Sequence, residues 1–381
     1  MKFESLSVLV CFLFFSSCSN NEDKRLVPLK FKKIGTISLK LDDETSGKSS
    51  YYDLVEMEED VFLAFLNKTN NSVYFYNLKN QELEKKIYFE KTGPNGVNEV
   101  TGFLIQSEDS IFVYSYNGRR ISLLNKNLEV INRYSIISDE REVNPQVNSL
   151  RKIHKVDNIL ILNSWGSQRE YYKNHDFPNS ILTFLDLENN KLSYDVTYPK
   201  KYTEGIWGTQ LYQVYHDFNT MNNELILNFP IDDKIYIYDF ENKLLKSEKV
   251  KNDIPLLINP LSKSQEKISI DLLSELKIIK SQKTYYFIRF INELEIYIRI
   301  INKEISEEDL NSGDLSKISF GESTLQFINK DFELISEVHL DKSYFLPSLF
   351  YNNGNIYIEK FQSDNEDILN FDVFNFSIMP N

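Results

Sequence analysis

The sequence is short of several residues on which common folds and sites depend. Alanine, the best helix former, occurs once in 381 residues, at Ala64, which argues against an all-helical protein. Cysteine occurs only at Cys11 and Cys18, both near the N-terminus, so disulfides, thiolate metal sites and cysteine nucleophiles are not expected in the mature chain. The 4 histidines show no HExxH or His-x-His spacing, and we therefore predict no metal and no cofactor.

Charge and composition narrow the class of protein further. The net charge is −13, from 43 basic and 56 acidic side chains, which argues against nucleic acid as a partner. Apolar residues make up 41% of the chain and include 27 Phe and 23 Tyr, enough for a large core. The sequence contains no Walker loop, nucleophile elbow or dinucleotide fingerprint, and the acidic stretch 42–44 lacks the spacing of a calcium loop. We interpret that stretch as a solvated turn and predict no catalytic residue.

The first residues follow the order of a cleaved export signal. A basic residue precedes an apolar run of about ten residues, Leu6 to Phe15, which is too short to span a bilayer. Two serines stand directly before Cys18, as in a bacterial lipobox. We predict a signal peptide over 1–17, a lipidated Cys18 that anchors the protein to a membrane, and a flexible polar tether over 18–30.

A hairpin of one plan recurs along the rest of the chain. An alternating apolar strand ends in Asn or Asp, a short turn rich in Asn follows, and a second strand begins at Leu. Each hairpin is preceded by two further strand candidates, so a four-strand unit recurs at about 40 to 50 residues, which is typical of a β-propeller. The five hairpins begin at Asn71, Arg120, Ile181, Lys234 and Thr324.

The two ends of the chain complete the count. Residues 345–350, 355–360 and 370–376 supply three strands of a sixth unit, and the N-terminal strand 33–41 has no partner of its own. Placing that strand as the fourth of the last unit closes the ring and removes exposed sheet edges. We predict an all-β protein, a single six-bladed β-propeller over 31–381, with seven blades or two β-sandwiches as alternatives.

The fifth unit is the least regular part of this pattern. Two strand-like runs, 284–290 and 294–301, each qualify as its second strand, and 291–322 is irregular. The span 262–280 has the composition of a short helix.

Three short motifs carry a resemblance to a known family. They are Phe65–Asn71 (FLNKTNN), Glu90–Val97 (EKTGPNGV) and Asp109–Val113 (DSIFV), in addition to the lipobox. Together they resemble a family of six-bladed, TolB-like propeller lipoproteins of Bacteroidota, catalogued as domain of unknown function 4221. The resemblance implies a location in the cell envelope, lipid-anchored to the outer membrane and either periplasmic or surface-exposed. It brings no catalytic residues.

Loop lengths separate the two faces of the predicted disc. Connections between first and second strands, and between third and fourth strands, are short and share one face. Long loops on one side of a rigid scaffold are where function usually lies. The long connections all fall on the opposite face, at 91–99, 137–147, 164–179, 200–210, 251–274 and 291–322.

These long loops also hold both tryptophans of the chain. Trp, Tyr and Arg side chains are typical of binding hot spots, and flat rings stack on sugars or cations. The alternative is that the rings fill gaps between neighbouring blades and belong to the core. The candidate ligand-binding residues are Trp165, Arg169, Tyr171, Tyr172, Tyr202, Trp207 and Gln210.

Three functions are compatible with this sequence. The favoured one is a lipid-anchored binding module that recognises a glycan, a peptide or an envelope protein through its loop-rich face. The alternatives are an extracytoplasmic hydrolase or lyase with a metal in the propeller channel, and a structural subunit of an envelope complex. Fold alone does not separate them. A ring of Asp, Glu or His at the channel mouth would favour an enzyme, whereas an apolar or Arg- and Tyr-lined mouth would favour binding.

Overall fold

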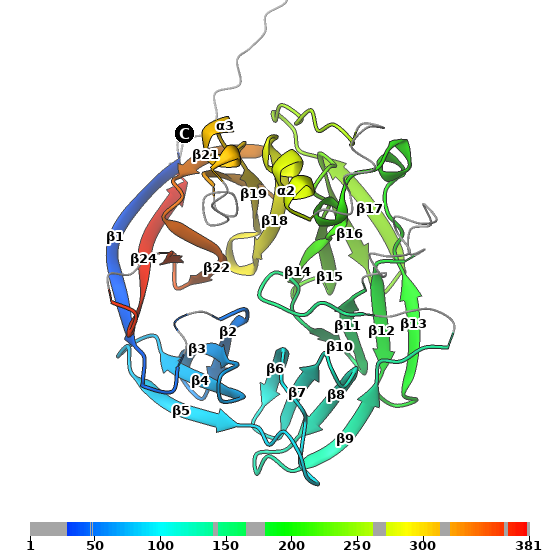
Figure 1. The fold of residues 1–381 in the computed structure, drawn as a ribbon, viewed down its shortest axis with the longest axis vertical. Helices are drawn as coiled ribbons and strands as arrows, with labels where there is room; N and C mark the ends of the chain where they lie inside the picture. The colour runs from blue at the N-terminus through cyan, green and yellow to red at the C-terminus, as the bar shows by residue number, and fades with distance from the viewer. Residues whose placement is uncertain are drawn as a thin grey trace, which may run out of the picture.

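Six four-stranded antiparallel sheets surround a common axis in this protein (Figure 1). The computed structural model describes residues 29–45, 47, 49–139, 144–164, 180–261, 272–312, 321–361 and 365–378. Within them the predicted six-bladed propeller is confirmed. The predicted leader, Cys18 and most of the tether lie outside the described residues. No helix in the described part of the chain is long and apolar enough to cross a membrane.

The first three blades follow one another along the chain, and in each the first strand lies nearest to the axis (Figure 1). Blade one contains β2 (Tyr52–Met57), β3 (Asp60–Asn67), β4 (Ser72–Asn77) and β5 (Leu83–Tyr88). Blade two contains β6 (Gly102–Ser107), β7 (Ser110–Ser115), β8 (Arg120–Leu124) and β9 (Val130–Ser135). Blade three contains β10 (His154–Val156), β11 (Ile159–Asn163), β12 (Leu182–Asp186) and β13 (Lys191–Asp195).

The last three blades have the same order, except that the sixth takes its outer strand from the N-terminus. Blade four contains β14 (Tyr215–Asn219), β15 (Glu224–Asn228), β16 (Lys234–Asp239) and β17 (Leu244–Lys249). Blade five contains β18 (Thr284–Ile291), β19 (Ile296–Asn302), β20 (Ser323–Asn329) and β21 (Leu334–Leu340). Blade six contains β22 (Tyr344–Asn352), β23 (Asn355–Lys360), β24 (Ile368–Ile378) and β1 (Leu29–Lys40).

Short helices occur only in the connections between these strands, in the part of the chain that the structure describes. In Figure 1, the helix α2 lies beside β18 and β19 of blade five, and α3 is drawn next to β21 of the same blade. The described helical segments are η1 (Lys200–Glu204), η2 (Thr209–Tyr212), α2 (Leu272–Lys280), η4 (Asn292–Leu294) and α3 (Glu307–Asn311).

The recurring Asn or Asp at the end of each third strand has a physical role. Its side-chain oxygen accepts a hydrogen bond from the backbone N–H two or three residues later, which forms the turn to the fourth strand. The distance is 2.9 Å at Asn77, 3.0 Å at Asn125, 2.9 Å at Asp186, 3.1 Å at Asp239 and 3.0 Å at Asn329. The same local chemistry therefore produces five of the six outer hairpins.

Ring closure occurs as the sequence predicts. The strand β1 pairs antiparallel with β24, with Thr36 opposite Asp372, so the two ends of the chain share blade six (Figure 1). Thr36 Oγ1 donates to Asp372 Oδ1 at 2.6 Å, and Lys33 pairs with the same carboxylate at 2.7 Å. The strand begins at Leu29, slightly before the predicted domain start at residue 31.

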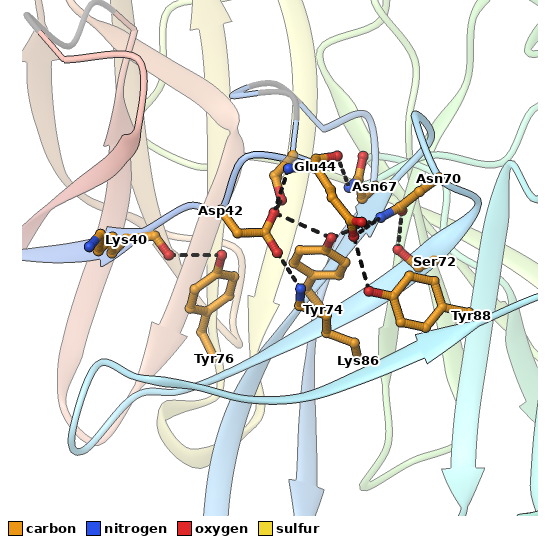
Figure 2. Close-up of polar contacts among 11 residues, drawn as sticks. Lys40, Asp42, Glu44, Asn67, Asn70, Ser72, Tyr74, Tyr76, Lys86 and Tyr88 are labelled. Atoms are coloured by element: carbon orange, nitrogen blue, oxygen red, sulfur yellow. Dashed lines mark hydrogen bonds and ion pairs between the residues drawn. The ribbon is translucent and has the colours of Figure 1, made fainter.

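A polar network joins the segment after β1 to blade one, and we call it the rim network (Figure 2). Asp42 forms an ion pair with Lys86 of β5 and accepts hydrogen bonds from Thr45 and Tyr74. Although partial burial alone would raise it, the bonds from Lys86 and Thr45 hold the pKa of Asp42 below its usual value. Residues 43 and 44 form an exposed turn, as the sequence predicts, and Asp42 beside it is bound to a neighbouring blade.

Blade five corrects a second expectation. Of the two candidate strands, 284–290 forms the first strand and 294–301 the second. The stretch 291–322 is thus not one long loop, since it contains a short turn and β19. Only the part after Asn302 connects second to third strand on the loop-rich face, and it contains α3.

Candidate functional site

The loop-rich face is the one at which each first strand begins. Every connection from one blade to the next reaches an inner strand there, so its last residues surround the channel axis. With the exception of 291–322, the long loops expected from the sequence connect strands at this face. A candidate site is therefore sought where the inner strands start.

A turn on this face bridges three blades near the channel axis, and we call it the plug turn. It comprises Asn148–Arg151, with Arg151 N donating to Asn148 O at 2.9 Å. The Ser149 hydroxyl accepts from Tyr52 N of blade one at 2.8 Å, and the Ser149 carbonyl accepts from Arg289 Nη2 of blade five at 2.6 Å. The turn itself leads into blade three. Because these three blades alternate around the ring, the turn lies across the axis.

Three hollows open around the plug turn. The first, of about 210 Å³, is lined by the plug turn together with Gln213, Tyr215, Tyr286 and Pro347. The second, of about 250 Å³, lies between η2, α2 and β18. The third, of about 90 Å³, lies between β18 and β22. Tyr286 lines all three, so they form one branched depression, which we call the mouth.

Arg151 is the most unusual side chain of the mouth. It is 6% exposed, and its Nε makes no hydrogen bond to any described residue. Its Nη1 reaches Gln213 Oε1 only at 3.5 Å, and its guanidinium carbon lies 5.4 Å from the centre of the Tyr215 ring. Burial lowers the pKa of Arg151, and the only described groups that oppose this are the phenols of Tyr215, Tyr286 and Tyr198. A buried cation without a carboxylate partner is costly, which marks this position as a place for an external anion.

The groups beneath the plug turn are paired or neutral. Lys152 Nζ lies 2.5 Å from Asp53 Oδ1, so blades one and three are joined by an ion pair. Asp217 accepts a hydrogen bond from Phe290 N at 2.8 Å. Asp53 and Asp217 are thus each bound to a neighbouring blade.

Two histidines lie together in the wall of the channel. The ring centres of His154 and His216 are 5.3 Å apart, and His154 also stacks on Phe218. Burial lowers the pKa of His154 to about 3, and burial together with His154 lowers the pKa of His216 well below its usual value. Both imidazoles are therefore neutral at physiological pH. Among the described residues, no group of three His, Cys, Asp or Glu is placed to hold a metal ion.

The residues predicted from the sequence are distributed unevenly over this site. Tyr202 is 0% exposed and donates its hydroxyl to Leu211 O at 2.7 Å, and Trp207 is 3% exposed and packs with it. Both lie in the core between blades, as the alternative interpretation of the tryptophans expected, and neither faces the mouth. Gln210 lines the second hollow. The remaining candidates lie outside the described residues, namely Trp165, Arg169, Tyr171 and Tyr172.

Sequence reasoning missed the residues that line the mouth. Arg151, Tyr215 and Tyr286 lie within three residues of the starts of β10, β14 and β18. Their position along the repeat was the available signal, because every residue at such a position lies near the channel axis.

The family motifs have structural roles. Asn71 has a left-handed backbone (φ 57°), donates to Phe89 O at 2.9 Å and accepts from Val100 N at 2.8 Å, which fixes the crossing from blade one to blade two. Residues 93–96 of the second motif form a turn, in which Gly96 N donates to Gly93 O at 3.0 Å. These motifs stabilise blade connections and do not line the mouth.

Comparison with known proteins agrees with this fold. The family model described as a domain of unknown function, DUF4221, matches residues 28–339. A member of that family from Bacteroides vulgatus is 18% identical, with a TM-score of 0.77 over 93% of this chain and 100% of that one. A putative exported protein from Bacteroides fragilis is 13% identical, with a TM-score of 0.55 over 92% of this chain and 96% of that one. None of the curated proteins matches the chain.

Proposed function

The chain belongs to the DUF4221 family, and from that premise we propose that it is an extracytoplasmic binding module. Its ligand, a glycan, a peptide or an envelope protein, enters the mouth beside Arg151 and Tyr286. The observation that carries this proposal is the buried guanidinium of Arg151, which faces a hollow without an internal counter-ion.

The lining of the mouth supports binding over catalysis. Aromatic rings and neutral amides surround the hollows, and no Asp, Glu or His occurs among their described lining residues. Hydrolases and lyases need a general base or a bound metal within reach of the substrate. The nearby His154 and His216 are buried in the wall and kept neutral, with no carboxylate to orient them. This arrangement gives less support to the hydrolase or lyase alternative.

The N-terminal sequence supports a location in the cell envelope. The lipobox before Cys18 would give a lipidated N-terminus, and the polar segment after it would hold the propeller away from the membrane. The relative from Bacteroides fragilis is described as a putative exported protein. We therefore propose an outer-membrane lipoprotein, with its propeller in the periplasm or at the cell surface.

Capture of ligands by the mature chain with Cys18→Ser tests the binding function. We expect capture from an envelope extract and from a glycan array, and we expect Tyr286→Ala to abolish it, because this ring borders all three hollows. Tyr116→Ala is the matched control, since Tyr116 is 46% exposed and lines none of them. Equal capture by both variants would contradict the proposed site.

Fractionation tests the location. Wild-type protein should sediment with outer membranes, and Cys18→Ser should release it into the soluble fraction. Mass spectrometry of the mature N-terminus should show acyl chains on Cys18. An unmodified Cys18 in a membrane-bound protein would refute lipid anchoring.

A further inference from the structure

The mouth differs in charge from the rest of the molecule. The chain carries 56 acidic and 43 basic side chains, yet the described residues that line the three hollows include Arg151, Lys280 and Lys303 and not one carboxylate. Lys303 pairs with Glu322 at 2.9 Å, with Glu322 59% exposed at the edge of the third hollow. In an acidic protein, a depression whose charged lining residues are all cations attracts anions, even with Lys303 paired to Glu322.

Within the mouth, Arg151 offers the specific hydrogen-bond donors for an anion. Its Nε makes no hydrogen bond to described residues, and the plug turn that carries it is bonded to blades one and five and leads into blade three. A planar guanidinium with free donors matches the two oxygens of a carboxylate better than a point charge does.

The other lining groups indicate what carries that carboxylate. The amides of Gln210, Gln213 and Asn302 offer both donors and acceptors, which suit hydroxyl groups. Tyr286 is half-buried and stands edge-on to Tyr215, with ring centres 5.1 Å apart, so a ring face is available for stacking.

The shape of the mouth favours a sugar over a peptide. The first hollow measures about 210 Å³ and is lined on one side by the plug turn, a size that suits a single ring at a chain end. An extended peptide commonly adds to a free sheet edge or lies along an apolar groove, and the hollows offer neither.

We propose that the mouth binds the carboxylate of an acidic sugar residue, with the Arg151 guanidinium as its counter-ion. This inference rests on the proposed binding function and assigns its ligand class. The ring of the sugar packs against Tyr286, and the lining amides bind its hydroxyl groups.

Matched sugars test the assignment by calorimetry on the full mature chain with Cys18→Ser. The probes are galacturonate against galactose and glucuronate against glucose, which differ only in the carboxylate. We expect the uronate of at least one pair to bind and its neutral partner to bind roughly 10- to 100-fold more weakly, the range for loss of a charge-assisted hydrogen bond.

Variants of Arg151 test whether this residue causes the difference in affinity between uronates and neutral sugars. Arg151→Gln should remove the preference for the uronate. Arg151→Lys should retain only part of it, because an ammonium lacks the two parallel N–H donors of a guanidinium. Arg133→Gln is the control, since Arg133 is exposed and bonds to the carbonyls of Pro94 and Gly96 far from the mouth. Circular dichroism checks that each variant is folded.

Further probes separate this inference from the proposed function. If acetate or phosphate binds as tightly as the uronate, the mouth is a general anion site and the sugar assignment is refuted. If N-acetylphenylalanine binds through Arg151 and neither uronate binds, the ligand is a peptide terminus. If no uronate binds while Tyr286→Ala still abolishes capture from the extract, this inference fails and the binding function stands. If Tyr286→Ala changes nothing, the binding function itself fails.

Discussion

The rim network and the mouth lie on the same face of the propeller, and they differ in whether their charged side chains have partners. At the rim, Asp42 is held by Lys86, Thr45 and Tyr74, and Glu44 accepts from Tyr88 at 3.2 Å (Figure 2). At the mouth, Arg151 is more deeply buried and has no ionic partner among the described residues. Satisfied polar groups stabilise a fold, whereas a buried unsatisfied one needs another explanation. The contrast therefore separates what holds the ring together from what is available to a ligand.

The largest expected effect is a pH dependence that originates at the centre of the ring and not at the rim. The folded-state pKa of His154 is about 3, below an unfolded value of about 6.5. The unfolded chain therefore binds the proton first, and stability falls as pH drops below 6.5. Between pH 6.5 and 5 one such histidine costs roughly 1.5–2 kcal/mol.

Urea unfolding at several pH values checks this prediction. The variant His154→Gln should lose less stability over that range than the wild type, because glutamine does not titrate. The rim should contribute only at lower pH, since the pKa of Asp42 lies below its usual value and its stabilisation is lost as pH falls through that pKa. Identical slopes for the wild type and His154→Gln would show that His154 is not kept neutral by burial.

At the rim, we expect Asp42→Ala to lower the free energy of unfolding by about 1–2 kcal/mol, because it removes a charge-assisted bond and the turn around Thr45. Ligand capture should not change, since the rim network is separate from the lining of the mouth. Thermal melts and the capture assay measure the two properties. A loss of capture in a folded Asp42→Ala variant would contradict the division between the two regions.

At the mouth, we expect Arg151→Met to raise stability and to remove binding, the reverse of Asp42→Ala. Removing a buried cation that has no carboxylate partner should raise the free energy of unfolding by about 1 kcal/mol, as for other functional sites that reduce stability. Binding of anionic ligands should be lost. If Arg151→Met instead destabilises the protein by as much as Asp42→Ala does, Arg151 is a structural residue and the comparison fails.

Much of the fold could be predicted from local chemistry. The residues Asn77, Asn125, Asp186, Asp239 and Asn329 end their strands in side-chain-capped turns, so the hairpin repeat is visible in the sequence. Ring closure followed because a lone N-terminal strand and a last blade one strand short complete each other. The strands of blade five were harder to assign, because the connection after β19 is long and does not begin with a side-chain-capped turn.

The candidate site was less predictable, and particular residues show why. Trp207 and Tyr202 have the composition of a binding surface, yet neighbouring blades bury them. Arg151 lies in the unremarkable sequence Asn148–Arg151, and its importance comes from contacts of the plug turn with Tyr52 and Arg289, which lie 97 and 140 residues from Ser149 in the sequence. Composition does not show whether a side chain is buried, and no local pattern encodes the contacts of the plug turn.

The sequence by itself determined the strand alternation, the capped hairpins and the number of blades, because each depends on residues close together in the chain. Only the tertiary structure decided which polar groups are satisfied. Asp42 pairs with Lys86, whereas Arg151 has no carboxylate partner among the described residues. Both outcomes depend on distances between blades, which are set only when the ring closes.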